Sequence, residues 1–157
     1  IEGSAEKEIP GGTLSPAYFI DKVSRYIPGE YSPSNSFCYA VLFQVQTPQG
    51  GDHYQIWSYN NQWVARAGPA SNIAHVQCFR PSPPAPARSF VKIGIADGDA
   101  SERFQCGTPS QDYCPPASKT PEICTDRGLK FVTTGPAIGR QIDSNYRWYA
   151  SWVLCEG

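Results

Sequence analysis

Tyr54-Gln55-Ile56-Trp57-Ser58-Tyr59-Asn60-Asn61-Gln62-Trp63-Val64-Ala65-Arg66-Ala67 is the stretch from which the fold class of this chain follows. Two segments rich in aromatic and β-branched residues flank the pair Asn60-Asn61, and such residues favour strands. Paired asparagines tolerate the positive φ angles that a tight hairpin turn requires. The stretch therefore predicts two antiparallel strands joined by a two-residue turn.

Further strands are predicted on both sides of this hairpin. Apolar residues alternate through 37–46, and the turn cluster at 47–52 returns the chain into the hairpin, so three consecutive antiparallel strands are expected. Segments 73–79, 90–96 and 128–134 are other strand candidates. The alternation is clearest through 146–154, which we expect to lie centrally in a sheet.

One short amphipathic helix is expected near the N-terminus. Ser15-Pro16 resembles a helix start, with an N-cap residue followed by proline at the first helical position. Apolar residues then recur with a spacing near the helical period up to Tyr26 and Ile27, and Pro28-Gly29 would end the helix.

Length and composition indicate one globular domain over residues 1–157. A chain of 157 residues and 17.2 kDa, with 40% hydrophobic and 13% aromatic residues, can bury a core of its own. Residues 1–14 are expected to be a flexible lead-in, 80–88 a proline-rich crossover between two sheets, and 106–124 a loop rich in cysteine and proline. The expected fold is mainly β: an antiparallel β-sandwich or a single covered antiparallel sheet with one short N-terminal helix, stapled by disulfides.

The cysteines predict those disulfides and the compartment. Their number, 6, is even and their spacing matches no zinc motif. Disulfides persist in oxidising compartments, so we expect an exported protein, extracellular or on a cell surface. The sequence does not choose among the 15 possible pairings of six cysteines. The six are Cys38, Cys78, Cys106, Cys114, Cys124 and Cys155.

Charge and hydropathy exclude two classes of partner. A net charge of −1 and a pI near 6.1 give no clustered positive charge for a nucleic acid backbone. No apolar run approaches the length of roughly 18 residues that a transmembrane helix needs, so no membrane span is expected.

The aromatic hairpin is also the best candidate binding site. Exposed rings can stack on the apolar faces of sugars, while amides and a guanidinium can bind the ring hydroxyls. The alternative is that the rings only pack across the strands of a β-rich core. The candidate ligand-binding residues are Trp57, Tyr59, Asn60, Asn61, Trp63 and Arg66.

A calcium site is a weaker possibility, and no other cofactor or metal is expected. Asp97, Asp99 and Glu102 place three carboxylates within six residues, although Asp-Gly after a strand is also ordinary hairpin sequence. No nucleophile, metalloprotease or phosphate-binding motif occurs, so we predict no catalytic residues and no enzyme. The only imidazoles are His53 and His75.

Carboxylates for glycoside hydrolysis could come only from scattered positions, and nothing local pairs two of them. These are Asp112, Glu122, Asp126 and Asp143.

One helix, antiparallel strands and the cysteine-bounded stretch from Cys124 to Cys155 resemble the head domains of type IV pilins. The long N-terminal apolar helix of that family has no counterpart in this sequence, so no residue role is transferred.

The expected function is that of a secreted or surface-displayed binding module, lectin-like or adhesin-like, which recognises a carbohydrate or another cell-surface ligand. The first alternative is a structural subunit of an extracellular assembly such as a pilus, a coat or a phage tail, which would have protein partners. The second is a secreted hydrolase or toxin whose catalytic residues meet only in space.

Overall fold

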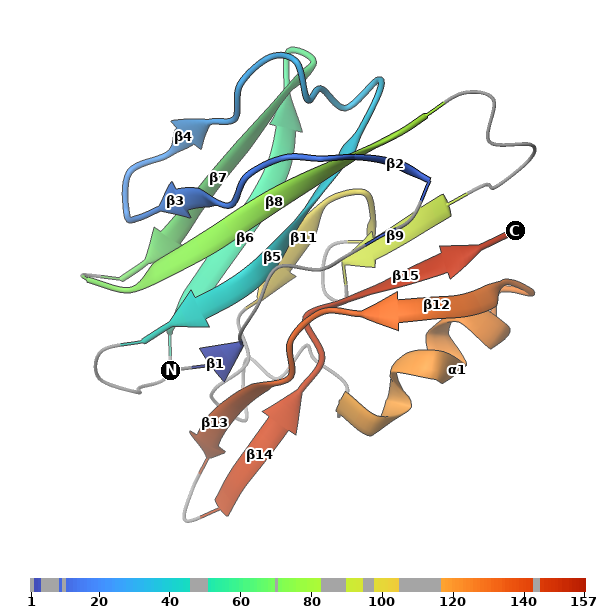
Figure 1. The fold of residues 1–157 in the computed structure, drawn as a ribbon. Coiled ribbons are helices and arrows are strands. Elements are labelled where there is room, and N and C mark those ends of the chain that lie inside the picture. Colours follow the sequence, from blue (N-terminus) through green and yellow to red (C-terminus); the bar gives the residue numbers. More distant parts are fainter. Residues whose placement is uncertain are drawn as a thin grey trace.

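The computed structural model describes residues 2–3, 9, 11–45, 51–69, 71–82, 90–94, 98–104, 117–142 and 145–157. These residues form three antiparallel sheets of four or five strands, a two-stranded ribbon and one short α-helix near the C-terminus (Figure 1). The predicted mainly β, antiparallel class is therefore confirmed. No helix among the described residues is long and apolar enough to cross a membrane.

Sheet A forms the middle of the molecule. Its central strands pair through nearly their whole length, with Cys38 directly opposite Cys78 and bonded to it as a disulfide. A bulge between Ala40 and Leu42 interrupts that pairing. The strands in sheet order are β1 (Glu2–Gly3), β5 (Phe37–Gln44), β8 (Ile73–Pro81) and β2 (Gly12–Leu14), and β3 (Tyr18–Ile20) also pairs with β8.

Sheet B contains the predicted hairpin. Tyr59 pairs with Gln62 across the turn, and Asn60 and Asn61 have φ angles of 49° and 55°, the left-handed values expected of a primed turn. The strands in sheet order are β11 (Glu102–Phe104), β6 (His53–Tyr59), β7 (Gln62–Gly68) and β4 (Arg25–Tyr26).

Sheet C and its neighbours hold the C-terminal part of the chain. The strand β15 lies centrally in sheet C, as predicted for this part of the chain. However, Ala150 and Ser151 separate β15 from β14, so 146–154 is not one strand. The order is β10 (Gly98–Asp99), β9 (Phe90–Gly94), β15 (Trp152–Glu156) and β12 (Lys130–Thr134). The ribbon pairs β13 (Ile138–Ile142) with β14 (Asn145–Tyr149). A 3₁₀ turn (Ala117–Lys119) leads into α1 (Thr120–Thr125), and Cys124 of that helix is bonded to Cys155.

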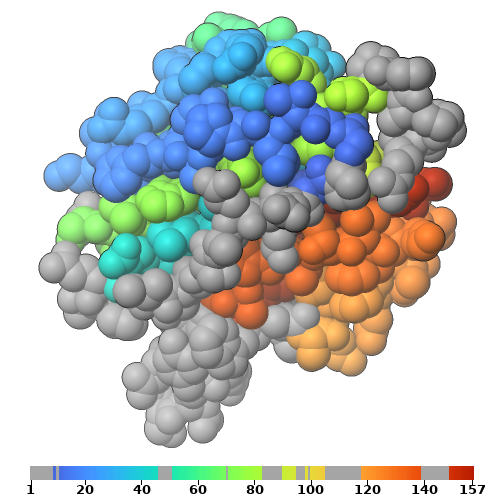
Figure 2. Space-filling model, viewed as in Figure 1, coloured from blue at the N-terminus to red at the C-terminus, as the bar shows by residue number. Residues whose placement is uncertain are grey.

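Two cores hold these layers together. The larger core lies between sheets A and B, where Ile56 and Ala65 of sheet B meet Ala40 and Val76 of sheet A. On the other face of sheet A, a second core joins it to Trp152 of sheet C. Sheets A and B therefore share one core, and sheet C packs against the opposite face of sheet A. In Figure 2 the N-terminal strands (blue) and the C-terminal segments (orange and red) occupy opposite parts of one face.

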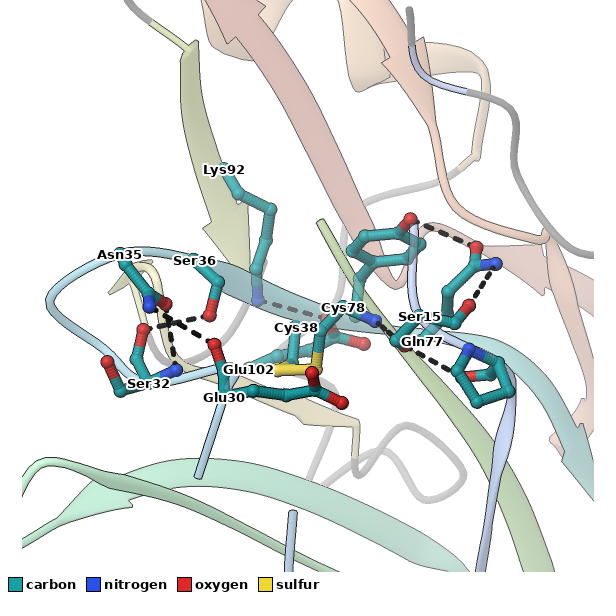
Figure 3. Close-up of a disulfide and its surroundings, with 12 residues drawn as sticks. Ser15, Glu30, Ser32, Asn35, Ser36, Cys38, Gln77, Cys78, Lys92 and Glu102 are labelled. Carbon is teal, nitrogen blue, oxygen red and sulfur yellow. Dashed lines mark hydrogen bonds and ion pairs between the residues drawn. A yellow bond between two sulfur atoms is a disulfide. The ribbon is translucent and has the colours of Figure 1, made fainter. Parts of the chain in front are cut away.

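A buried polar cluster joins all three sheets. Lys92 of β9 and Glu102 of β11 are both fully buried, with Lys92 Nζ 3.1 Å from Glu102 Oε1 (Figure 3). The Tyr54 hydroxyl of β6 donates a hydrogen bond to the same carboxylate, and so does the backbone N–H of Ala40 in β5. Trp152 Nε1 of β15 donates to the Ala40 carbonyl at 2.8 Å.

The ionisation of this cluster reflects its burial. Burial raises the pKa of the Glu102 carboxyl above its ordinary value, while the Lys92 ammonium and the donated hydrogen bonds oppose that rise. Burial, together with the neighbouring carboxylate, also raises the pKa of the Tyr54 hydroxyl well above its ordinary value. A Cβ atom on Gly94 would collide with the Ser101 carbonyl oxygen, so the missing side chain permits β9 to approach β11.

The predicted N-terminal helix is wrong. Residues 15–27 contain the strands β3 and β4 instead, because the segment Tyr18–Ile20 pairs with β8 and buries alternate residues. Ile20 is 1% exposed and Phe19 is 54% exposed, whereas a helix would have placed both on one apolar face. The Asp21 carboxylate then accepts the Val23 N–H and turns the chain toward β4.

The predicted hairpin between 37–46 and 53–59 is also wrong. In the described residues β5 pairs with β1 and β8, and β6 pairs with β7 and β11, so the two strands lie in different sheets. Both edges of each strand are already occupied by these partners. The chain between β5 and β6 therefore connects two different sheets, and residues 47–50 of the predicted turn cluster lie outside the described residues.

Other expectations fall partly on residues that the structure does not describe. Two disulfides, Cys38–Cys78 and Cys124–Cys155, are present, and Cys106 and Cys114 lie outside the described residues.

Of the expected crossover at 80–88, residues 83–88 are also outside the described residues. The strands before and after it lie in sheets A and C. Within the expected lead-in at 1–14, strands β1 and β2 pair with sheet A.

We predict that the change Glu102→Gln lowers the free energy of unfolding by about 3–5 kcal/mol, because it leaves the buried Lys92 without an anionic partner. The double variant Lys92→Met with Glu102→Gln should recover most of that loss, since no buried charge remains and Tyr54 keeps an acceptor. Urea denaturation of the oxidised proteins measures both. A double variant as unstable as the single one would contradict the prediction.

The turn offers a second stability test. Asn61→Ala should lower the free energy of unfolding by about 1 kcal/mol, because a Cβ without a polar side chain is disfavoured at its left-handed φ. Asn61→Gly should leave stability equal or slightly higher. Gln62→Ala, at the neighbouring exposed position, is the control, and thermal denaturation compares the three. Equal losses for alanine and glycine at position 61 would refute the argument.

Candidate functional site

The outer face of sheet B carries the most distinctive set of exposed side chains. Residues directly opposite each other in antiparallel strands share a face. Val64 of β7 lies opposite Trp57 of β6 on one side and opposite Tyr26 of β4 on the other. Tyr59 follows Trp57 by two residues and so lies on the same face.

These rings are exposed to different degrees. Tyr26 and Tyr59 are 57% and 56% exposed, and Trp57 is half-buried. Val64, which shares this face with them, is 3% exposed and so is covered. We refer to Tyr26, Trp57 and Tyr59 as the aromatic row.

A polar pocket lies beside the aromatic row on the same face. This polar pocket has a volume of about 230 Å³ and is lined by His53, Gln55, Arg66 and Arg103. The register explains this grouping, because Gln55 lies directly opposite Arg66 of β7 and directly opposite Arg103 of β11. His53 precedes Gln55 by two residues on the same strand. None of the four lining side chains is acidic.

The backbone next to this pocket fixes the ring of His53. Its Nδ1 atom lies 2.8 Å from the Gly51 carbonyl oxygen, which can only accept a hydrogen bond. That contact assigns the hydrogen to Nδ1 and leaves Nε2 for another partner. A Cβ atom on Gly68 would lie 3.1 Å from His53 Cε1, so the ring packs against the bare backbone of the opposite strand.

Five of the six residues predicted from the sequence lie on this face or at its end. Trp57, Tyr59 and Arg66 belong to the outer face, and Asn60 and Asn61 are exposed in the turn that closes it. Trp63 is the exception: it is 1% exposed and belongs to the core between sheets A and B. The register pairs Trp63 with Ser58 and Trp57 with Val64, so the two tryptophans lie on opposite faces of the sheet and Trp63 is on the inner one.

Two members of the site, Tyr26 and Arg103, are not among the residues predicted from the sequence. The apolar spacing predicts a helix at Tyr26, whereas Tyr26 lies in β4, a strand of two residues that is too short to show a periodicity. Arg103 reaches the face because β11 pairs with β6 from 48 residues further along the chain, as the Tyr54 to Glu102 separation shows. Arg103 can be assigned to this site only when its pairing with Gln55 is known.

The expected calcium site loses one of its three carboxylates. Glu102 is fully buried and binds Lys92 and Tyr54, so it is not available to an ion at the turn. Asp97 and the side chain of Asp99 lie outside what the structure describes. Among the described residues, no group of three or more His, Cys, Asp or Glu side chains could hold a metal ion.

The residues considered for catalysis do not converge in the described part of the chain. His75 packs beside Phe19, with ring centroids 6.3 Å apart. Glu122 of α1 is exposed, and its Oε1 atom lies 3.6 Å from Nζ of Lys119 in the preceding 3₁₀ turn. Asp126 is exposed at the end of that helix, and Asp112 and Asp143 lie outside the described residues.

A larger hollow of about 480 Å³ lies where β8 and β9 approach the loop before β5. The rings of Phe37 and Phe90 line this hollow, and Arg80 is the positively charged residue among those that line it. Arg80 already contacts the Tyr31 ring and donates to the Glu30 carbonyl at 3.2 Å. The guanidinium group in this hollow is therefore already engaged within the protein.

The outer face of sheet B thus combines apolar ring faces with amide and guanidinium donors on paired strands. Comparisons of the chain with family models, curated proteins and solved structures found no match.

Proposed function

We propose that this protein is a carbohydrate-binding module, lectin-like or adhesin-like, whose site is the outer face of sheet B. The observation that carries the proposal is the continuity of the aromatic row with the polar pocket. Trp57 and Gln55 are two residues apart on one strand, so the rings and the polar donors lie about 7 Å apart along the sheet. A ligand of two or more sugar units can contact both.

The chemistry of the two parts suits a sugar. Pyranose rings present C–H groups that stack on the face of Trp or Tyr, while their hydroxyls accept and donate hydrogen bonds. Gln55 supplies both a donor and an acceptor, and Arg66 supplies a fork of donors. Paired strands hold these groups more firmly than a loop would, which reduces the entropy lost on binding.

The two disulfides support a secreted or surface-displayed location. Such bonds are typical of proteins that fold in an oxidising compartment. A rigid binding face on a disulfide-stapled domain suits recognition of ligands outside the cell. We favour binding over catalysis because the residues that line the polar pocket include no carboxylate that could act with His53 as an acid–base pair.

A glycan array with the oxidised protein tests the proposal. We expect selective binding that Trp57→Ala weakens by about fivefold, because the loss of one stacked ring removes about 1 kcal/mol of contact energy. Tyr59→Ala should act in the same direction. Phe19→Ala is the matched control, since Phe19 is equally exposed but lies on sheet A.

Unchanged melting temperatures would show that the variants remain folded. Selective binding that survives both Trp57→Ala and Tyr59→Ala would reject this face as the site, and a blank array from folded protein would reject the function.

Exposed apolar residues in β3 and in the segment between β3 and β4 support a second function, that of a subunit in an extracellular assembly. Phe19 and Val23 are 54% and 53% exposed, although large apolar side chains are usually buried. Neither residue belongs to the aromatic row. A contact between protein subunits would cover them.

Sedimentation of the protein over a range of concentrations tests this alternative. Self-association that disappears in the double variant Phe19→Ser with Val23→Ser would support it. A monomer at all concentrations, with no change in the variant, would count against it.

A further inference from the structure

Lys92 and Glu102 place an amine and a carboxyl group in contact inside the protein. Both side chains are fully buried, and Lys92 Nζ lies 3.1 Å from Glu102 Oε1, an oxygen bonded directly to the carboxyl carbon Cδ (Figure 3). An amine and a carboxyl group can condense to an amide with the release of one water molecule. The buried pair therefore holds the two reactants of such a condensation at contact distance.

The backbone keeps these two groups together. The Ala100 N–H donates a hydrogen bond to the Lys92 carbonyl at 2.8 Å, which closes the turn onto the strand that carries the amine. Gly94 has no side chain and so admits the backbone at Ser101 and Glu102. Groups held in this way react as if at a very high local concentration, because little further entropy is lost on the way to the transition state.

Two hydrogen-bond donors face the carboxyl group. The Tyr54 hydroxyl donates to Glu102 Oε2, and the Ala40 N–H donates to the same carboxyl group. When Nζ adds to Cδ, negative charge develops on a carboxyl oxygen, and donors that are already in place stabilise that charge. The Tyr54 hydroxyl can also pass a proton to the oxygen that leaves.

The surroundings of the pair are apolar. The rings of Phe43 and Phe104 pack on Tyr54, with centroids 5.2 Å and 5.8 Å from the centroid of the tyrosine ring. Burial raises the pKa of the Glu102 carboxyl, which favours the neutral acid. Transfer of a proton from the ammonium to the carboxylate gives a neutral amine and a neutral acid, the two forms that react. Exclusion of water then protects the amide from hydrolysis.

We propose that Lys92 and Glu102 form an intramolecular isopeptide bond, a covalent cross-link between sheets C and B. Nζ bonds to Cδ, the bond from Cδ to one carboxyl oxygen breaks, and that oxygen leaves as water. Of the three hydrogens on the ammonium group, one stays on the amide nitrogen and two leave with the water. The step therefore needs no oxidant, reductant or added reagent. It is independent of the proposed carbohydrate-binding function.

Intact mass spectrometry of the reduced and denatured protein tests the proposal. We expect a mass lower than that of the sequence by one water molecule. Because an acylated lysine is not a trypsin site, trypsin should fail to cleave after Lys92 and should release residues 89–103 as one peptide. A mass equal to that of the sequence, with normal cleavage after Lys92, would overturn the proposal.

A second digestion locates the bond. Cleavage before Asp97 and Asp99 should leave a branched product in which 89–96 and 99–103 remain joined. A succinimide at Asp97-Gly98 also loses one water molecule, but it joins no second segment. Loss of water without the branched product would therefore overturn the proposal as well.

The double variant Lys92→Met with Glu102→Gln is the matched control, because it lacks the amine and is expected to fold. It should have the full mass of its sequence, and loss of water from its 89–103 segment would contradict the cross-link.

Tyr54→Phe tests the proton transfer. This variant keeps the ring and loses the hydroxyl, so formation of the cross-link, followed in samples taken during expression, should slow by about a hundredfold or more. An unchanged rate would overturn the role assigned to that hydroxyl.

Discussion

The contact between Lys92 and Glu102 is the constraint on which the arrangement of the three sheets depends. Two fully buried charges 3.1 Å apart are stable only when each has its partner, so β9 of sheet C and β11 of sheet B must lie together. Tyr54 and the Ala40 N–H satisfy the remaining oxygens of the carboxylate, and Trp152 satisfies the Ala40 carbonyl. A shift of any one sheet would leave a buried polar group without its partner, at a cost of a few kcal/mol.

The same cluster positions the candidate site on the far side of sheet B. Tyr54 and Glu102 point inward, so the alternation of the strands directs Gln55 and Arg103 outward. The inward-facing residues of β6 and β11 are packed in the core, which fixes the backbone of both strands. The positions of the outward-facing residues are fixed with it. The side chains of the candidate site on these strands are therefore held by paired backbone and not by a loop.

Prediction from the sequence succeeded where the structure depends on neighbouring residues. The hairpin at Asn60-Asn61 forms as expected, because the turn and both strands are local. The prediction from the sequence was wrong at Ser15–Ile27. The apolar spacing there is compatible with a helix, but Tyr18–Ile20 pairs instead with β8, a strand more than 50 residues away. Periodicity indicates which residues can be buried, but the partner that buries them decides which backbone they adopt.

The sequence by itself determined a disulfide-stapled, mainly β chain with a tight hairpin and most of its strand positions. It also determined that Trp57, Tyr59 and Arg66 lie near one another, because they share one hairpin. Only the tertiary structure decided that Trp63 is in the core and that Tyr26 and Arg103 complete the outer face. The physical reason is that strand order and burial come from contacts between distant segments, and a residue's inward or outward direction follows from them.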